Sequence, residues 1–237
     1  MNKDEKIIHG KIDPARIKAI LFDVDGTLSD TDDHMVARLT SRLNPVAWLF
    51  KDRDPQGFAR RLVMAAETPG NFFYQIADRL GIDRFLAKYY KIISTRRSAR
   101  KPGKERFWLI PGVREMLERL SETFPMGVVS ARDNKSTKEF LNYFELTSFF
   151  QVIVTSQTCQ YTKPYPDPVI YAAKALGMAP EDCVMVGDTI VDIKSGKSAG
   201  AQTVAVLCGF GTEKELKRVG ADLILSAAPD IQSILSG

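Results

Sequence analysis

The sequence predicts an α/β protein in which a doubly wound parallel sheet is interrupted by a helical insertion. From about residue 107 onward, short apolar runs alternate with amphipathic segments, and one further apolar run lies near the N-terminus at 18–23. Apolar strands that alternate with helices are typical of a parallel sheet covered on both faces. Residues 30–106, which separate the first run from the others, have helical composition without a clear strand.

The expected strands are short and apolar, and one amphipathic segment separates most of them from the next. After the strand at 18–23, we expect strands at 126–130, 150–154, 183–187, 203–207 and 222–225. The expected helices of this region cover 111–122, 133–143, 166–176, 189–199 and 212–219. Pro166 suits the first turn of its helix, and Gly177 suits the position just after the last turn.

This pattern predicts two domains. Residues 1–29 and 107–237 form the core that carries the chemistry, and residues 30–106 form a helical cap with helices at 31–43, 55–67, 70–80 and 83–97. Residues 31–106 hold sixteen Lys and Arg against eight Asp and Glu, whereas the whole chain has a net charge of only +4. An acidic core beneath a basic cap suits a metal site that faces an anionic substrate. A solvated helical surface explains the charge of the cap equally well.

The composition excludes several classes of protein. No run approaches the ~18 apolar residues of a membrane span, and residues 1–17 are too rich in Lys, Asp and Glu for a secretory signal. Three cysteines without a CxxC spacing indicate reduced thiols and a cytoplasmic location. The basic run at 96–106 lacks the interleaved aromatic residues of a nucleic-acid site, so we expect neither nucleic-acid nor membrane partners. Both a monomer and a homodimer are compatible with the sequence.

The chemistry must come mostly from carboxylates, lysines and hydroxyls, because the chain has only two histidines, His9 and His34. No GxSxG elbow is present, which argues against a Ser-His-Asp hydrolase, and a histidine-rich metal site is excluded by the same shortage. The polar residues at strand ends are the stronger candidates, since ligands of doubly wound sheets bind outside the carboxyl ends of the strands.

Polar side chains follow four of the expected strands. They are, in chain order, Asp23 and Asp25, Ser130 and Arg132, Lys163, and Asp188 and Asp192. Each type suits a phosphate or a metal ion. The conjunction at equivalent strand ends is far more specific than any one of its members, and it indicates a catalytic site.

The two acids after the first strand suggest a nucleophile and a proton carrier. Asp23 can attack phosphorus and form an acyl-phosphate. Asp25, two residues further on, has the reach to protonate the leaving oxygen and then to deprotonate the water that hydrolyses the acyl-phosphate. Crowded carboxylates raise the pKa of one of their number, which suits an acid/base role.

The other strand-end residues neutralise and hold a phosphate in this hypothesis. Asp23 and Asp188 supply hard oxygen ligands for Mg²⁺, and Lys163 adds a compact positive charge as the third catalytic group. A hydroxyl and nearby backbone N–H groups hold the phosphoryl oxygens, while a glycine turn anchored by a threonine passes beside them. The expected substrate-binding residues are therefore Gly26, Thr27, Ser130, Ala131 and Lys163.

Each member also has a purely structural explanation. An Asp-x-Asp-Gly segment is common in turns. Ser130 could cap the helix that is expected to start near Asp133, and Asp188 could cap the helix after Thr189. Only a coincidence of several such explanations would remove the catalytic hypothesis.

These residues resemble the motifs of the haloacid dehalogenase superfamily. Asp23-Val24-Asp25-Gly26-Thr27 is similar to its first motif, Ser130 to its second, Lys163-Pro164 to its third, and Gly187-Asp188-Thr189 with Asp192 to its fourth. The resemblance covers most of the chain and implies a Rossmann-like core with a helical cap inserted after the first motif, Mg²⁺ dependence and an aspartyl-phosphate intermediate. It also implies that Asp188 completes a metal set with Asp23 and Asp25. Asp192 would then lie behind the ligands, where it orients Lys163 or a metal-bound water.

Within that superfamily, the chain resembles phosphoglycolate phosphatase-like enzymes, although these commonly have Thr-Asn where this chain has Ser130-Ala131. The acid at Asp25 favours phosphoryl transfer over dehalogenation. We therefore expect a Mg²⁺-dependent phosphatase that acts on a small anionic phosphorylated metabolite. Two alternatives stay open. One is a phosphomutase of the β-phosphoglucomutase type, which shares Thr31 but has a histidine one place after His34, and the other is a non-enzymatic phospho-acceptor domain.

Overall fold

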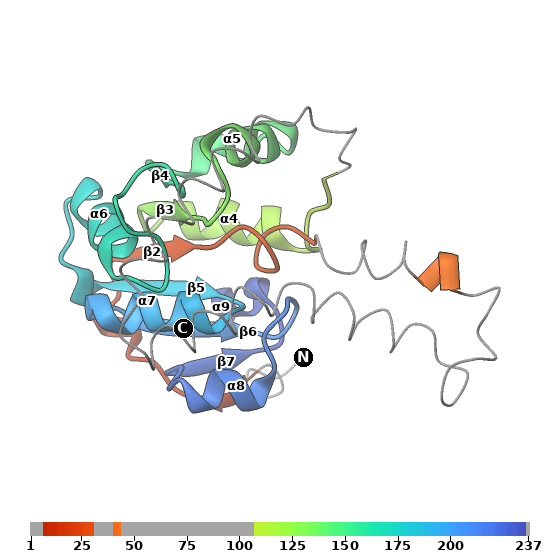
Figure 1. The fold of residues 1–237 in the computed structure, drawn as a ribbon. Helices are drawn as coiled ribbons and strands as arrows, with labels where there is room; N and C mark the ends of the chain where they lie inside the picture. The colour runs from red at the N-terminus through yellow and green to blue at the C-terminus, as the bar shows by residue number, and fades with distance from the viewer. Residues whose placement is uncertain (1–6, 31–39, 44–106, 236–237) are drawn as a thin grey trace.

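The computed structural model describes residues 7–30, 40–43 and 107–235, and these residues form a seven-stranded sheet flanked by helices (Figure 1). In sheet order, the strands are β1 (Ile7–Gly10), β7 (Leu223–Leu225), β6 (Gln202–Val206), β5 (Cys183–Gly187), β2 (Ala19–Phe22), β3 (Met126–Val129) and β4 (Val152–Val154). All neighbouring pairs are parallel except β1 and β7, which are antiparallel. The predicted α/β class with a doubly wound core is confirmed.

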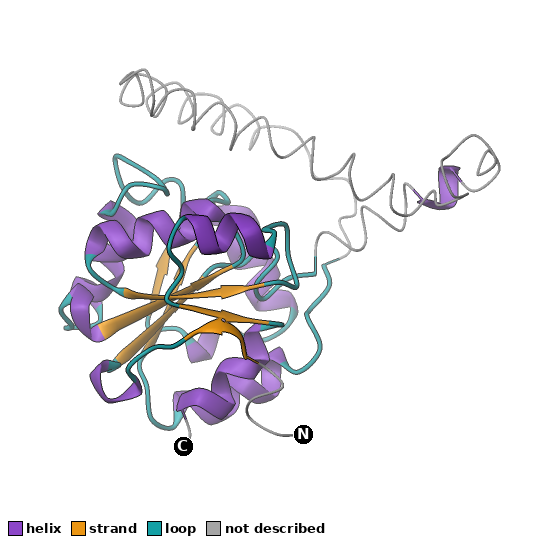
Figure 2. Ribbon diagram, turned by 90° about the horizontal axis from the view of Figure 1, so that it is seen from below, coloured by secondary structure: helices purple, strands orange, loops and turns teal. Residues whose placement is uncertain are grey.

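Helices cover both faces of the sheet, as Figure 2 shows. The α-helices are α4 (Val113–Ser121), α5 (Asn134–Tyr143), α6 (Asp167–Ala175), α7 (Ile190–Ala199), α8 (Glu213–Arg218) and α9 (Ile231–Leu235). Short 3-10 helices lie at η2 (Pro14–Arg16), η5 (Thr147–Phe149), η6 (Pro180–Asp182) and η7 (Ala228–Asp230). In the described part of the chain, no helix combines the length and the apolar character needed to cross a membrane.

Alternate residues of each strand point to opposite faces and build separate cores. In β2, Ile20 and Phe22 pack in the cluster that includes α4, α5 and α9, whereas Ala19 and Leu21 pack in the cluster that includes α6. A third cluster joins β6 and β7 to α7 and α8. Because both faces are buried, the strands need apolar residues at every position, which explains why they read as continuous apolar runs.

Of the strands and α-helices in the described residues, β1 and α9 were not expected from the sequence. β1 is a four-residue edge strand whose register with β7 shifts between Ile7 and His9, so it lacks a regular alternation that could reveal it. α9 has only five residues and follows Pro229, which is too short for a helical period to show. The other expected strands and helices of the core are present, with ends that differ by up to two residues.

The two segments that flank the predicted insertion pair with each other. The backbone N–H of Asp30 donates to the carbonyl of Trp108 at 2.9 Å, and that of Ile110 donates to the carbonyl of Leu28 at 3.0 Å. The chain therefore leaves the core and returns to it at one place. Apart from Asp30 and the helical residues 40–43, the predicted cap at 30–106 lies outside the described residues, and its domain boundaries stay a prediction.

Candidate active site

The candidate site lies where β2 and β5 end side by side. These parallel strands are neighbours although the chain passes through β3 and β4 between them, so their carboxyl ends mark the topological switch point of the sheet. Asp23 directly follows β2, and its N–H continues the ladder by donating to the carbonyl of Val186 at 2.9 Å. Asp188 directly follows β5. The fold thus brings two acids that are 165 positions apart to adjacent strand ends.

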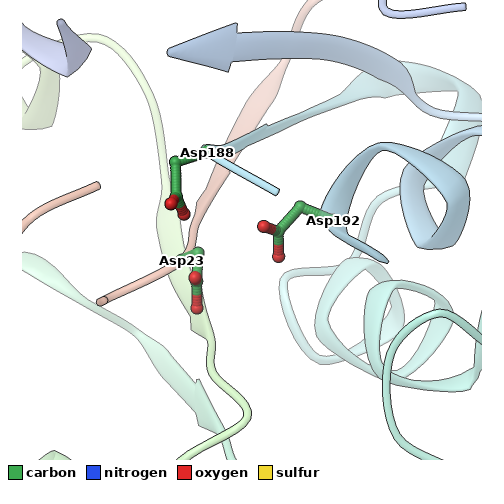
Figure 3. Close-up of side chains that lie close together, drawn as sticks. All are labelled: Asp23, Asp188 and Asp192. Atoms are coloured by element: carbon green, nitrogen blue, oxygen red, sulfur yellow. The ribbon is translucent and has the colours of Figure 1, made fainter. Parts of the chain in front are cut away.

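Three carboxylates gather at this place (Figure 3). One oxygen from each of Asp23, Asp188 and Asp192 lies within 4.8 Å of the others, and all three residues are buried. Asp23 follows the end of β2, Asp188 follows β5, and Asp192 lies in the first turn of α7. Buried carboxylates at this spacing repel one another, so the cluster requires positive charge.

Lys163 supplies part of that charge. Its Nζ lies 2.8 Å from Oδ1 of Asp23 and 2.5 Å from Oδ1 of Asp192, and it also donates to the backbone carbonyl of Val129 at 2.9 Å. With three acceptors around it, the ammonium group is fully hydrogen-bonded although its side chain is almost completely buried. The structure therefore places Lys163 against Asp23 and Asp192, whereas the resemblance left open whether Asp192 orients Lys163 or a metal-bound water.

The surroundings shift the pKa of both partners. Burial raises the pKa of Asp23 to about 7, opposed by the charge of Lys163 and reinforced by Asp192 and Asp25. For Lys163, burial acts to lower the pKa, but the charges of Asp192 and Asp23 outweigh it and raise the pKa above its ordinary value. Lys163 is therefore a permanent cation at neutral pH, whereas Asp23 without a second cation is only partly ionised.

Asp192 serves as the support of this arrangement. Its Oδ2 accepts hydrogen bonds from the N–H of Thr189 at 3.0 Å and from the hydroxyl of the same residue at 2.5 Å, which leaves Oδ1 to face Lys163. The backbone of Gly187 passes so close that an added Cβ would lie 2.3 Å from the Cβ of Asp192. Both oxygens of Asp192 are thus already engaged within the protein.

Asp188 is enclosed by a loop that the sequence analysis did not identify. In the loop at 207–211, which follows β6, Gly209 and Gly211 lie against Asp188, and the N–H of Phe210 donates to its Oδ2 at 2.8 Å. A Cβ on Gly209 would lie 2.1 Å from the same oxygen, and a Cβ on Gly26 would lie 2.3 Å from it. On the other side, the hydroxyl of Thr27 lies 3.4 Å from Oδ1. The glycines at 209 and 211 after a strand end were the signal in the sequence.

Gly26 and Thr27 lie beside Asp188 at this edge of the sheet, and their expected role in substrate binding stays a prediction. They contact Asp188, and Gly26 adopts a left-handed backbone conformation with φ of +70°. Cys208 bonds the same turn from the far side, with its Sγ 3.2 Å from the carbonyl oxygen of Gly26. The turn after β2 and the loop after β6 therefore hold Asp188 between them.

Ser130 also lies at this edge of the sheet. Its N–H continues the ladder from β3 by donating to the carbonyl of Val154 at 2.9 Å, and its Oγ accepts from the N–H of Arg132 at 3.1 Å. The N-cap of α5 is Asp133, whose Oδ1 accepts from the N–H of Ser136 at 3.0 Å. Asp133, not Ser130, therefore caps the helix. Ser130 is buried, and Ala131 beside it is exposed.

The carboxylate of Asp25 is outside the group of three acids but near enough to Asp23 for its charge to raise the pKa of that residue. It forms a two-pronged ion pair with Arg132, in which Nε lies 2.6 Å from Oδ2 and Nη2 contacts Oδ1. Asp25 was expected both as acid/base and as metal ligand. Among the described residues, its side chain is not one of the three acids that lie close enough together to hold one metal ion, and both roles stay predictions. The ion pair with Arg132 was not foreseen.

A divalent cation fits the residues that are present. Asp23 and Asp188 offer carboxylate oxygens at adjacent strand ends, and hard oxygen ligands are those that Mg²⁺ or Ca²⁺ takes. Asp192, whose oxygens contact Lys163 and Thr189, is better suited to hold the cluster in place than to donate to the ion. The net negative charge of the cluster is the electrostatic reason for a cation here.

The structure defines a class of protein: a Rossmann-like α/β core in which charged side chains gather at the topological switch point of the sheet. The chain belongs to the haloacid dehalogenase-like hydrolase family, whose model matches residues 20–206. It is 30% identical over 232 residues to a phosphoglycolate phosphatase of Nitrosococcus oceani, a match that covers 92% of this chain and 96% of that protein. It is also 28% identical to the pyrophosphatase PpaX of Anoxybacillus flavithermus, over 92% of this chain and 97% of that one.

Solved structures share the fold. A predicted phosphoglycolate phosphatase from Haemophilus somnus superposes with a TM-score of 0.60 at 23% identity, over 92% of this chain and 98% of that one. A phosphatase of the same family from Thermococcus onnurineus gives a TM-score of 0.58 at 23% identity, over 93% and 99% of the two chains. The predictions of this family and of an enzyme of the hydrolase class with phosphatase relatives are confirmed.

Proposed function

We propose that this protein is a Mg²⁺-dependent phosphatase that hydrolyses a small phosphorylated metabolite through a phosphorylated Asp23. The observation that carries the proposal is the position of Asp23, a buried carboxylate at the end of β2 with the Nζ of Lys163 at 2.8 Å and the carboxylate of Asp188 in the same cluster. A nucleophile at a switch point, next to a fixed cation and a set of metal-type ligands, is suited to attack on phosphorus.

Two displacements make up the proposed reaction. In the first, an oxygen of Asp23 attacks phosphorus, the bond from phosphorus to the substrate oxygen breaks, and Asp25 gives its proton to the departing oxygen. In the second, a water molecule attacks the same phosphorus while Asp25 takes its proton. The bond to Asp23 then breaks, which releases inorganic phosphate and restores both carboxyl groups.

Other residues hold the charge that moves through these steps. Bound Mg²⁺, held by Asp23 and Asp188, would supply a positive charge that offsets the repulsion between carboxylate and phosphate. Lys163 keeps its proton throughout and stabilises negative charge on the phosphoryl oxygens. Ser130 and the backbone beside Ala131 lie at the same strand edge, where they would bind those oxygens. Asp192 orients Lys163 through the ion pair at 2.5 Å.

The names of the relatives support a substrate class for the proposal. The curated relatives are named for phosphoglycolate and pyrophosphate cleavage, and both names describe small anions that carry a phosphoryl group. We therefore propose a small phosphorylated anion as substrate, which agrees with the positive charge expected on residues 31–106.

The test is turnover of p-nitrophenyl phosphate, phosphoglycolate and pyrophosphate by the purified full chain, with Mg²⁺ and with excess EDTA. We expect Mg²⁺-dependent phosphate release that Asp23→Asn lowers by at least ~10³-fold. The matched control is Asp182→Asn, because Asp182 lies at the opposite end of β5 and pairs with Lys18 at the surface. Equal rates for Asp23→Asn and the wild type on all three substrates would reject the proposal.

The same experiment separates the alternatives. A phosphomutase of the β-phosphoglucomutase type would return a phosphorylated isomer instead of inorganic phosphate when given a hexose phosphate. A non-enzymatic phospho-acceptor would retain a long-lived phosphoryl group on Asp23 after treatment with acetyl phosphate, without catalytic turnover.

A further inference from the structure

Arg132 has contacts at both its backbone and its guanidinium group. Its backbone N–H donates to the hydroxyl of Ser130 at 3.1 Å, and its carbonyl accepts from the N–H of Ser156 at 2.9 Å. Its guanidinium carbon lies 6.0 Å from the ring centre of Phe107 and 5.5 Å from that of Phe140. A guanidinium held by cation–π contacts on two rings has little rotational freedom.

The held guanidinium fixes the carboxylate of Asp25. Two N–H groups of one plane face the two oxygens of the carboxylate, with the Nε contact at 2.6 Å. Such a paired contact sets the plane and the rotamer of the acid as well as its distance. The Asp25 side chain is 33% exposed, so it needs a partner to keep one orientation, whereas the Arg132 side chain is only 15% exposed.

We propose that Arg132 is a positioning residue that sets the orientation of the Asp25 carboxylate, one oxygen of which exchanges its contact with the guanidinium for the proton that it donates, while the other oxygen stays paired. This inference rests on the proposed function, because it assigns Arg132 a role through the acid/base of that reaction. Asp25 follows Asp23 by two residues, so the orientation of its side chain decides whether a proton can reach the oxygen that leaves the phosphorus. Arg132 itself has no need to touch the substrate.

Arginine is the side chain that this role requires. A lysine offers a single ammonium, which can pair with one carboxylate oxygen but cannot match both or stack on two rings. A methionine keeps much of the apolar stem against Phe107 and Phe140 but removes the fork. Arg132→Lys therefore keeps the charge but loses the paired contact, and Arg132→Met keeps much of the packing but loses both the charge and the paired contact.

The experiment compares two substrates that differ in their leaving group, p-nitrophenyl phosphate and phenyl phosphate, with the full chain and saturating Mg²⁺. Phenolate is the poorer leaving group and depends more on a proton from the enzyme. We expect Arg132→Met to lower kcat on phenyl phosphate by about 100-fold and on p-nitrophenyl phosphate by about tenfold or less, with KM changed less than threefold. We expect Arg132→Lys to lower kcat less than Arg132→Met does. Arg119→Ala, at an exposed position, should have the kcat of the wild type.

A double-mutant cycle identifies the route of the effect. If Arg132 acts through Asp25, then Arg132→Met combined with Asp25→Asn will be no slower than Asp25→Asn alone. The inference would be overturned if the fold-losses in kcat of the two single variants multiplied in the double variant. It would also be overturned if Arg132→Met lowered kcat equally on the two substrates. Full activity of Arg132→Lys would also overturn it, because it would show that charge alone suffices. Thermal melting of each variant identifies a loss that comes from unfolding.

The two proposals fail in different ways. A wild type whose turnover does not depend on Asp23 overturns the proposed function and this inference with it. A wild type that depends on Asp23, together with Arg132→Met behaving as Arg119→Ala does, overturns the role of Arg132 alone.

Discussion

At the scale of single residues, Asp23 combines two properties that work against each other. It is buried, which raises its pKa to about 7, and the proposed reaction requires it to be ionised. Lys163 offsets part of the cost, but Asp192 uses the same ammonium and Asp188 adds a further charge. The isolated cluster is therefore electrostatically strained, and a bound cation would relieve it.

Neutralising Asp23 should stabilise the metal-free protein at alkaline pH. Because the pKa of Asp23 is raised from 3.8 to about 7 in the folded state, the folded protein holds this proton more tightly than the unfolded chain does. Stability conferred by the group is thus present at low pH and lost as the pH rises from 3.8 to about 7. In EDTA at pH 8, we expect Asp23→Asn to raise the free energy of unfolding by at least about 1 kcal/mol, or Tm by roughly 2–4 °C.

The measurement is thermal unfolding of both proteins between pH 5 and pH 8, with Asp182→Asn as the control. The advantage of Asp23→Asn should shrink toward pH 5, where the wild type is protonated at this position. A lower Tm for Asp23→Asn at pH 8 would contradict the electrostatic account of the cluster.

At the scale of elements, most of the core could be predicted because its strands are buried on both faces. Ile20 and Leu21 belong to different packing clusters, so the whole strand must be apolar, and this leaves a strong signal. β1 and α9 left no such signal, since one is an irregular edge strand and the other has a single turn or little more. An element can be predicted only when its hydrophobic pattern is long and regular enough to be recognised.

The candidate site could be predicted only in part, for a related reason. Asp23, Ser130, Lys163 and Asp188 follow strands, and parallel strands end at one edge, so their meeting follows from the fold class. The Arg132 ion pair and the loop at 207–211 depend on how side chains and turns lie in three dimensions. The sequence places Arg132 at a strand end but does not show that its side chain pairs with Asp25.

The loop at 207–211 yields a prediction at this scale. A Cβ on Gly209 would lie 2.1 Å from Oδ2 of Asp188, so Gly209→Ala must displace either the carboxylate or the loop. We expect Gly209→Ala to weaken Mg²⁺ binding by about tenfold or more, because a carboxylate ligand shifted by a fraction of an ångström loses its geometry. Isothermal titration of the metal-free protein with Mg²⁺ measures this directly.

Gly177→Ala is the matched control. Gly177 has φ of +72° and no atom within 4 Å of an added Cβ, so this variant suffers backbone strain without a collision. It should lose about 1 kcal/mol of stability and keep its affinity for Mg²⁺. Equal Mg²⁺ affinity in the two glycine variants would show that the loop does not position Asp188.

At the scale of the whole molecule, metal binding and folding should be linked. The cluster exists only when β2, β5 and α7 are assembled, because its three acids come from these separate parts of the chain. A cation that binds the folded state alone stabilises it by mass action. At a Mg²⁺ concentration 100 times Kd, we expect a gain of about 2.7 kcal/mol, or roughly 5–10 °C in Tm.

Differential scanning calorimetry with and without Mg²⁺ checks this gain, and Ca²⁺ serves as a comparison for ion size. Asp188→Asn should abolish most of the gain, whereas Asp182→Asn should leave it intact. An unchanged Tm for the wild type in saturating Mg²⁺ would mean that the cluster does not bind the ion.

The pairing of the segments around Asp30 and Trp108 has a consequence for how such a chain can diversify. The backbone leaves the core at Asp30 and re-enters it beside that residue at Trp108. The hydrogen bond between these two residues, at 2.9 Å, joins the two ends at the edge of the core. The residues between these two paired ends can therefore be replaced by a unit of another length without separating β2 from β5. The strand ends that carry the candidate site and the residues between Asp30 and Trp108 can therefore change in sequence independently of each other.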